Sequence, residues 1–192
     1  FLTSGVKVLI YYNQPNCSDA SSATAQPWLE IVSSWKKIGN NKKTIVFASS
    51  VAHSKNLAES FIDIGVKAAH IDGETDNKER QRVLDEFNNG DMKIICNCMV
   101  LTEGFDCPPA EVCVLARPTK SLGMYIQMVG RVLRPYKNKN KATIIDHSGA
   151  VYTHGFIEDD IDWTLNTKSV QTIKERKLSK PKEVAQIICC LL

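Results

Sequence analysis

Residues 44–71 read TIVFASSVAHSKNLAESFIDIGVKAAHI, and this stretch decides the class of fold. Thr44 to Ala48 form a short apolar run rich in strand formers, and the two serines that follow are natural helix caps. Apolar residues then recur at helical spacing until Gly65, a residue typical of a helix end. Val66 to Ile71 form a second strand-like run. The stretch therefore predicts a strand, a helix and a second strand.

The same alternation continues along the chain. Further strands are expected at residues 93–98, 111–116 and 142–146, and further helices within 76–90 and over 121–134. Strands that alternate with helices through short links pair in parallel by right-handed crossovers. We therefore expect an α/β fold, a three-layer α/β/α sandwich with a mainly parallel sheet. Ligands in such sheets bind at the carboxyl ends of the strands.

The chain divides into three expected segments. Residues 1–42 are interpreted as an interdomain linker with a leading helix that begins at Pro27, although Val6 to Tyr12 could form a strand. Residues 43–148 are the α/β domain. Residues 149–192 are interpreted as a peripheral C-terminal extension, because an acidic stretch and then a basic one show no core-forming period.

Composition excludes several classes of protein. Hydrophobic residues make up 43% of the 192 and charged residues 23%, so the chain is neither disordered, collagen-like nor a small disulfide scaffold. No apolar stretch is long enough for a membrane span, so no membrane partner is expected. Seven cysteines without a secretory signal favour a reducing, cytoplasmic setting. Cys96 and Cys98 fit a buried strand better than a metal site, so no metal ligands are expected.

The net charge of +3 permits a polyanionic partner without requiring one. Two lysine clusters are each open to two interpretations, a solvated loop or a phosphate-facing patch. They are Lys36, Lys37, Lys42 and Lys43, and then Lys137, Lys139 and Lys141.

The sharpest motif is QMVGRVLR at residues 127–134. On a helix Gln127, Gly130, Arg131 and Arg134 share one face, while Leu122, Ile126, Val129 and Leu133 fall on the opposite face, which can pack on the sheet. Two guanidinium groups one turn apart suit a polyphosphate, with Gly130 leaving room for close approach. The alternative is a surface helix with ordinary ion pairs.

A second motif, LTEGFDCPP, follows a predicted buried strand at residues 101–109. Gly104 permits unusual dihedral angles and exposed amides, and Asp106 could accept a hydrogen bond from a sugar hydroxyl. The alternative is a tight connection made rigid by two prolines. Each motif alone leaves its alternative open.

Together the motifs resemble those of superfamily 2 helicases. Residues 127–134 resemble motif VI, QxxGRxxR, and residues 102–106 resemble motif V. Residues 44–50 resemble motif IV, and the segment from His70 to Phe87 resembles the conserved region between motifs IV and V. The order matches the second, C-terminal RecA-like lobe of these DEAD/DEAH-type motors, with the P-loop NTPase fold but no Walker motifs of its own. RPTKS at 117–121 and DHSG at 146–149 resemble the RadD-like branch, related to DNA-repair helicases and restriction-enzyme motors.

The resemblance implies a role for each motif residue. Arg131 and Arg134 would be arginine fingers on ATP, and Gln127 would help to place the nucleotide or the attacking water. The residues implied to bind the nucleotide are Gly104, Asp106 and Gly130. Those implied to bind the nucleic-acid backbone are Ser49, Gly73 and Thr102, with His53 and Lys55 as weaker candidates.

The sequence lacks a Walker A loop, GxxxxGK[ST], and a DExH motif after a hydrophobic strand. ATP and Mg²⁺ are therefore expected to be held mainly by an N-terminal RecA-like lobe of the same protein, and the chain by itself is expected not to hydrolyse ATP. The expected partner is single- or double-stranded DNA, with RNA as an open alternative. Two other functions compete: a stand-alone, non-catalytic nucleic-acid-binding module, and an unrelated nucleotide-binding α/β enzyme.

Overall fold

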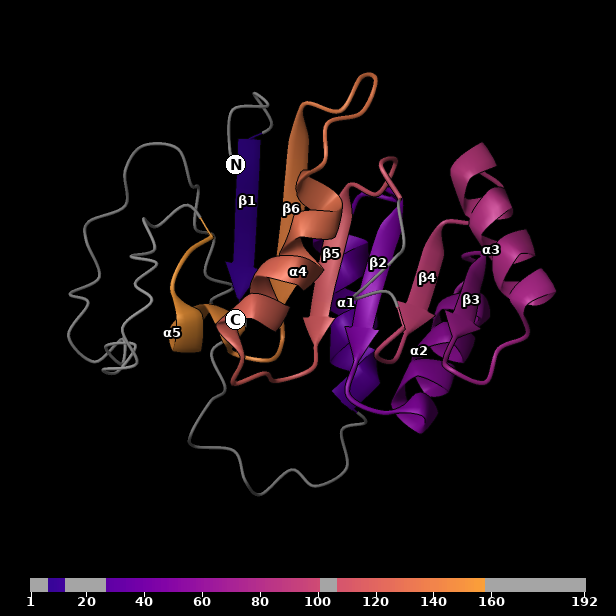
Figure 1. Cartoon of the computed structure of the whole chain (residues 1–192), viewed down its shortest axis with the longest axis horizontal. Helices are drawn as coiled ribbons and strands as arrows, with labels where there is room; N and C mark the ends of the chain where they lie inside the picture. The colour runs from indigo at the N-terminus through magenta and orange to yellow at the C-terminus, as the bar shows by residue number, and fades with distance from the viewer. Residues whose placement is uncertain (1–6, 13–26, 101–106, 158–192) are drawn as a thin grey trace.

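The computed structural model describes residues 7–12, 27–100 and 107–157, which form one parallel sheet with helices on both faces. The strands are β1 (Lys7–Tyr12), β2 (Thr44–Ala48), β3 (Ala68–Ile71), β4 (Ile94–Asn97), β5 (Val112–Ala116) and β6 (Lys141–Asp146). Their order across the six-stranded sheet is β1-β6-β5-β2-β4-β3. All five pairings are parallel, so the carboxyl ends of the strands share one edge (Figure 1). The predicted α/β class is confirmed.

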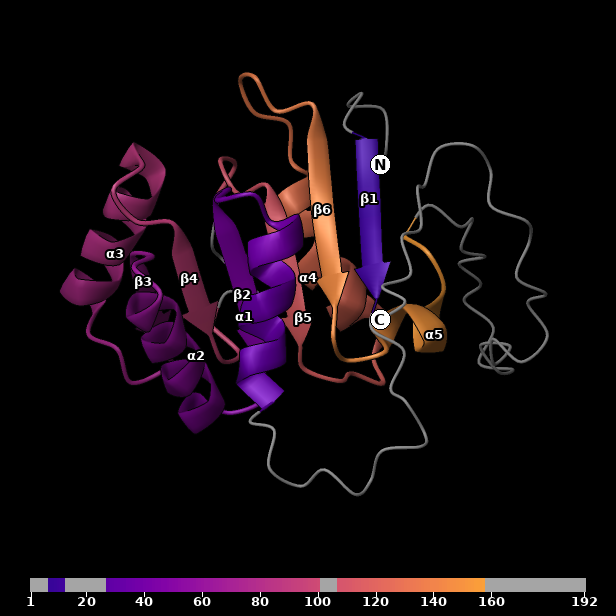
Figure 2. The same ribbon diagram turned by 180° about the vertical axis from the view of Figure 1, so that it is seen from behind.

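Five helices in the described part of the chain complete the layers. They are α1 (Pro27–Ile38), α2 (Val51–Asp63), α3 (Asn77–Asn89), α4 (Leu122–Leu133) and α5 (Ala150–His154). One apolar layer is built by α3, α4 and α5 against the sheet, and the other by α1 and α2 (Figure 2). Both faces of the central strands are therefore covered, which explains why β2 and β5 are buried at every position and why their sequences show no polar alternation.

The structure differs from the expected boundary at residue 43. Strand β1, expected within a linker, is the edge strand beside β6, in register from Lys7 opposite Lys141 onwards. Helix α1 packs on the sheet through Ile31, Val32 and Trp35, which are 2–5% exposed. The folded unit therefore includes segments that precede residue 43. Without β1, strand β6 would be an unpaired edge, and without α1 the face of the sheet beneath it would be uncovered.

Trp35 fixes α1 against β2. Its indole Nε1 donates a hydrogen bond to Thr44 Oγ1 at 2.7 Å, and its ring meets Phe61 of α2 edge to face with centroids 5.3 Å apart. Both the polar atom and the ring of this buried tryptophan are thus satisfied, as a well-packed core requires.

The boundary expected at residue 149 also differs. Ala150 and Val151 of α5 are buried in the same apolar layer as α4, and the rings of Tyr125 and His154 are stacked with centroids 5.4 Å apart. The start of the expected peripheral extension therefore belongs to the core. Residues 158–192 lie outside the described part of the chain.

Candidate nucleotide and nucleic-acid site

Helix α4 carries the predicted finger residues. It begins after Ser121, whose hydroxyl accepts a hydrogen bond from the Met124 amide at 3.3 Å. It ends at Leu133, one residue before the predicted end, because Pro135 disfavours a helical conformation in the residue before it. Arg134 is accordingly the C-cap, with extended backbone angles of φ −63° and ψ 133°. Arg134 therefore leaves the helix instead of continuing its face.

The predicted faces of α4 are partly wrong. The buried apolar residues are Tyr125, Met128, Val129 and Val132, whereas Leu122, Ile126 and Leu133 are only partly buried. Most of the residues that face the core therefore lie one position earlier in the sequence than predicted. Helix α4 also packs on α5, through the Tyr125 ring. Tyr125 Oη donates to the Gly155 carbonyl at 3.3 Å, which holds α4 in this orientation.

The four motif residues of α4 differ in accessibility. Gln127 is exposed, Gly130 and Arg134 are half-buried, and Arg131 is buried at 8% exposure. A Cβ atom built on Gly130 would meet nothing within 4 Å, so the helix surface there is open. The structure therefore places Arg131 among the packed side chains of α4 and Arg134 at the C-terminal end of the helix.

Ser49 and Gly73, two of the predicted backbone-binding residues, follow strands β2 and β3 at the carboxyl edge of the sheet. Ser49, just after β2, is exposed, and its hydroxyl lies 2.9 Å from His53 Nδ1. Ser50 caps α2 by accepting a hydrogen bond from the His53 amide at 3.1 Å. Burial lowers the pKa of His53, so this imidazole favours its neutral form. The pair Ser49 and His53 thus presents neutral hydrogen-bonding groups at the start of α2.

Gly73 lies in a turn that is organised by Asp72. One carboxylate oxygen of Asp72 accepts from the amides of Glu74 and Thr75 and from the Thr75 hydroxyl at 2.9–3.0 Å. The other lies 3.0 Å from His70 Nε2. These hydrogen bonds, from His70 and Thr75 first, lower the pKa of Asp72 to about 2. The turn leaves Gly73 exposed, with open space where a side chain would stand.

Two further groups hold this turn in place. His70 Nδ1 lies 2.7 Å from the hydroxyl of Ser54, a fully buried residue of α2. Arg80 donates from Nη2 to the carbonyls of Asp72 and Thr75 at 3.1 and 3.3 Å. The sequence resemblance included His70 and Arg80 but assigned them no role. An aspartate followed by glycine, with threonine three residues on, is the local signal for such a turn.

A second buried carboxylate closes the end of β6. Asp146 is fully buried, and it accepts from the Ser148 amide and hydroxyl at 2.9 and 2.8 Å and from the Val151 amide at 2.8 Å. His154 Nε2 lies 2.8 Å from the Thr119 carbonyl, in the loop that leads to α4. Asp146 therefore links the end of β6 to α5, and His154 links α5 to the loop before α4.

In the first lysine cluster, Lys42 and Lys43 are engaged within the protein, whereas Lys36 and Lys37 of α1 are exposed. Lys42 forms an ion pair with Glu111, and Lys43 donates from Nζ to the Asn88 carbonyl at 2.8 Å while lying 5.6 Å from the Phe87 ring centre. The second cluster is divided: Lys137 and Lys141 are exposed, but Lys139 is buried at 7% exposure. Lys139 therefore fits neither predicted interpretation. Its buried side chain is not part of a solvated loop, and it does not lie on the surface where it could face a phosphate.

Thr102, Gly104 and Asp106 lie outside the described residues. Among residues 7–12, 27–100 and 107–157, no three His, Cys, Asp or Glu side chains lie close enough together to hold a metal ion. Cys96 is fully buried in β4, in line with the core position expected for it. Every helix in the described part of the chain is too short or too polar to cross a lipid bilayer.

The parallel sheet, the turns at its carboxyl edge and the arginine-bearing helix define a RecA-like lobe. The chain matches the family described as "Helicase conserved C-terminal domain" over residues 26–136, and it belongs to that family. The predicted superfamily is thereby confirmed: this is the C-terminal lobe of a superfamily 2 helicase. The RadD-like branch stays a prediction.

Individual relatives agree with this placement. The chain is 36% identical over 152 residues to the "51.5 kDa protein" of Lactococcus phage (isolate 7-9), covering 79% of this chain and 33% of that protein. It is 38% identical over 109 residues to the "Putative ATP-dependent helicase IRC3" of Saccharomyces cerevisiae, covering 57% of this chain and 16% of that protein. The chain thus spans a third or less of the length of these relatives.

Solved structures show the same fold. The C-terminal domain of the DEAD-box protein Dbp5 superposes with a TM-score of 0.59 at 20% identity, covering 78% of this chain and 81% of that domain. At this identity the likeness concerns the fold alone.

Proposed function

We propose that this chain is the second motor lobe of an ATP-dependent helicase or translocase. In this proposal Arg131 and Arg134 act as arginine fingers on ATP that an N-terminal RecA-like lobe of the same protein holds, together with Mg²⁺. The observation that carries it is the arrangement of α4 in a chain of the helicase C-terminal family, with Gln127, Gly130 and Arg131 on the helix and Arg134 at its exit.

The chemistry follows from the two guanidinium groups. An arginine stays charged at any working pH and presents N–H groups in a planar fork, so it stabilises the charge that develops on the transferred phosphoryl group. Such a group accelerates the reaction only when it reaches the phosphate in the transition state. Closure of the two lobes around ATP would supply this contact, and reopening after hydrolysis would release it.

The carboxyl edge is the proposed path of the nucleic acid. Exposed Ser49 and Gly73 offer a hydroxyl and an unobstructed backbone, groups that bind phosphates without reading sequence. Thr102 completes this set in the proposal. DNA is the proposed strand, and a role in DNA repair is proposed with it, on the basis of the RadD-like resemblance. The proposed cytoplasmic setting rests on the seven cysteines without a secretory signal.

A second candidate function is a stand-alone nucleic-acid-binding module. In that case this chain would bind a strand without hydrolysing ATP, since its own sequence holds no Walker A or DExH motif. The two candidates differ in one outcome, the effect of a finger substitution on ATP turnover.

The test joins this chain to its N-terminal lobe and measures ATP hydrolysis with and without single-stranded DNA. We expect DNA-stimulated turnover in the joined protein and none in the chain alone. Arg131→Ala should lower kcat at least about 100-fold. Arg82→Ala is the matched control, because Arg82 is an exposed arginine paired with Glu79 on α3, and it should change kcat less than about twofold.

Two results would overturn the proposal. If the joined protein hydrolyses no ATP, the chain is not a motor lobe, and the binding module becomes the better account. If Arg131→Ala and Arg82→Ala have equally small effects on kcat, the finger assignment of Arg131 is wrong even though the protein is an ATPase.

A further inference from the structure

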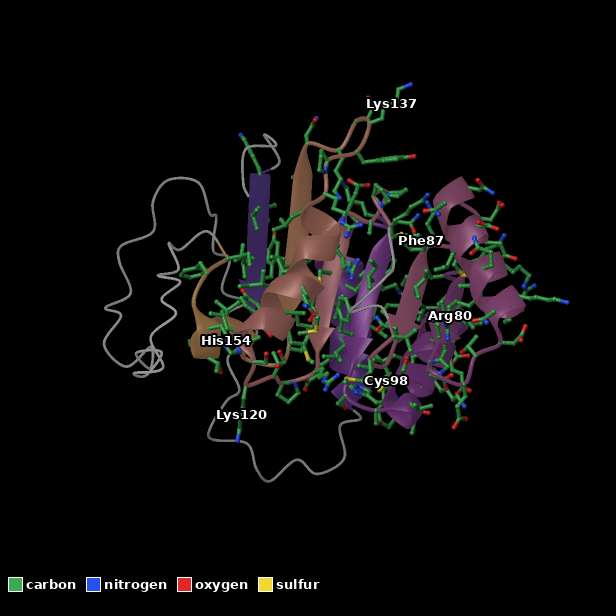
Figure 3. The ribbon with its side chains drawn as sticks, viewed as in Figure 1. Arg80, Phe87, Cys98, Lys120, Lys137 and His154 are labelled. Carbon is green, nitrogen blue, oxygen red and sulfur yellow. The ribbon has the colours of Figure 1, made fainter. Side chains whose placement is uncertain are left out.

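The connection between α4 and β6 turns sharply so that neighbouring lysines face opposite ways. The Lys139 amide donates to the Tyr136 carbonyl at 3.0 Å, and Asn138 has a left-handed backbone with φ 65°. Asparagine tolerates this conformation better than most residues. As a result, Lys137 points outward into solvent at the end of the loop (Figure 3), whereas Lys139 points into the protein and is 7% exposed.

Lys139 joins two segments that are far apart in sequence. Its Nζ donates to the Arg134 carbonyl at 3.0 Å, five residues back, and to the Pro108 carbonyl at 3.2 Å, 31 residues back. Arg134 is the C-cap of α4, and Pro108 follows the 101–106 stretch that resembles motif V. One ammonium group thus bridges the backbones at the ends of both motifs.

A buried ammonium is costly, which makes its placement informative. Removing a charge from water costs several kcal/mol unless hydrogen bonds compensate. Here burial lowers the pKa of Lys139 to about 8, although the nearby Glu111 and Cys107 favour the charged form. Glu111 is already paired with Lys42. The carbonyls of Arg134 and Pro108 are therefore the groups to which Lys139 Nζ donates directly.

We propose that Lys139 is a positioning residue that holds Arg134 where its guanidinium can reach the nucleotide. This inference rests on the proposed function, because it matters only if Arg134 is a finger. Two constraints then define the direction in which Arg134 leaves α4. Pro135 imposes its extended backbone, and Lys139 anchors its carbonyl to Pro108.

The expected consequence is kinetic. A misplacement of about 1 Å in a group that acts in the transition state can lower a rate by about 100-fold. Loss of the Lys139 bridge should therefore lower kcat for ATP hydrolysis while the KM for ATP changes little, because the other lobe holds the nucleotide.

The test is a double-mutant cycle in the joined two-lobe protein, measured by steady-state ATP hydrolysis over a range of ATP concentrations. Lys139→Met removes the N–H donors but keeps the length and packing of the side chain, and Lys137→Met is the control on the exposed side of the same loop. We expect Lys139→Met to lower kcat about 10- to 100-fold and Lys137→Met to change it less than about twofold. In an Arg134→Ala background, Lys139→Met should lower kcat by less than about twofold further.

The outcomes separate the two proposals. If Arg134→Ala abolishes turnover but Lys139→Met resembles Lys137→Met, or lowers kcat equally in both backgrounds, the positioning role is wrong and the finger stands. If Arg134→Ala leaves kcat unchanged, the finger assignment of Arg134 fails, and the role of Lys139 fails with it. Thermal unfolding checks that each variant folds. If Lys139→Met does not fold, Lys139→Leu, which also removes the N–H donors, replaces it in the same cycle under the same criteria.

Discussion

Two turns in this lobe are each organised by one buried charge, and they use it in opposite ways. In the turn after β3, the Asp72 carboxylate accepts hydrogen bonds from the Glu74 and Thr75 amides, the Thr75 hydroxyl and His70. In the turn before β6, the Lys139 ammonium donates to the carbonyls of Arg134 and Pro108. The first charge gathers groups from its own turn, whereas the second reaches across the fold.

The pKa values of the two residues express this difference. Hydrogen bonds lower the pKa of Asp72 to about 2, so folding favours its charged form. Burial lowers the pKa of Lys139 to about 8, so folding disfavours its charged form. A buried charge can therefore either stabilise a fold or be tolerated by it. The outcome depends on whether the energy of its hydrogen bonds and ion pairs exceeds the hydration energy that it loses on burial.

The largest effect is expected for Asp72→Ala, which leaves several donors of the β3 turn without their acceptor. We expect the free energy of unfolding at pH 7, measured with urea, to fall by about 3 kcal/mol. Asp72→Asn keeps an acceptor oxygen and should cost less. Because the folded-state pKa lies below the ordinary value of 3.8, the contribution of the carboxylate is present above about pH 4 and is lost as the pH falls to about 2.

If Asp72→Ala and Asp72→Asn are both within about 0.5 kcal/mol of the wild type at pH 7, the turn does not depend on the carboxylate. The contrast with Lys139 then disappears.

The next effect concerns the pH dependence of Lys139. Between its folded pKa of about 8 and its ordinary value of 10.5, the unfolded state binds more protons than the folded state. Stability should therefore rise with pH in this range, relative to Lys139→Met, by on the order of 2 kcal/mol from pH 7 to pH 10. Urea unfolding at both pH values measures it, with Lys137→Met as the control. A constant difference between wild type and Lys139→Met would show that burial does not perturb Lys139.

A smaller effect is expected at Asn138, whose left-handed backbone turns Lys139 inward. Asn138→Ala should lower the free energy of unfolding by about 1 kcal/mol, because a Cβ-bearing residue without a local hydrogen-bonding side chain resists this conformation. Asn140→Ala, an exposed neighbour, is the control and should be nearly neutral. Equal effects of the two substitutions would mean that the turn does not constrain Asn138.

The smallest change in stability is expected for Gly73→Ala. The backbone of Gly73 is not left-handed, and a Cβ there meets nothing within 4 Å, so stability should rise by about 0.5 kcal/mol or less. If a strand backbone lies against Gly73, the Kd for single-stranded DNA should rise about threefold or more, while its dependence on salt stays the same because no charge changes. Fluorescence anisotropy at several salt concentrations tests this, and an unchanged Kd would exclude Gly73 from the strand path.

Most of the fold could be predicted because its signals are local. Apolar runs located β2, β5 and β6 to within a residue, and Ser50, Asp76 and Gly90 marked helix ends as predicted. The Asp72 turn belongs to the same group, since its acceptor and donors lie within three residues of one another. Local hydrogen-bonding patterns of this kind can be recognised in a sequence without knowledge of the tertiary structure.

The rest depended on long-range packing. Nothing near Lys139 in the sequence indicates that it is buried while Lys137 is exposed, because its acceptor on Pro108 lies 31 residues away. The predicted core face of α4 was wrong for a similar reason. Tyr125 faces the core and stacks on His154, a residue 29 positions later in the sequence. Likewise, membership of β1 in the sheet depends on the outer edge of β6, which only the strand order reveals.

The position of β1 has a mechanical consequence. Among the described strands it pairs with β6, and the two strands run parallel over six paired positions (Figure 1). Tension applied along the axis of β1 would load these hydrogen bonds together in shear, whereas tension across the sheet would open them one at a time. We expect the lobe to resist a pull at residue 7 along the strand far better than a pull across it, which optical tweezers with two attachment geometries can measure. Equal rupture forces in the two geometries would refute this expectation.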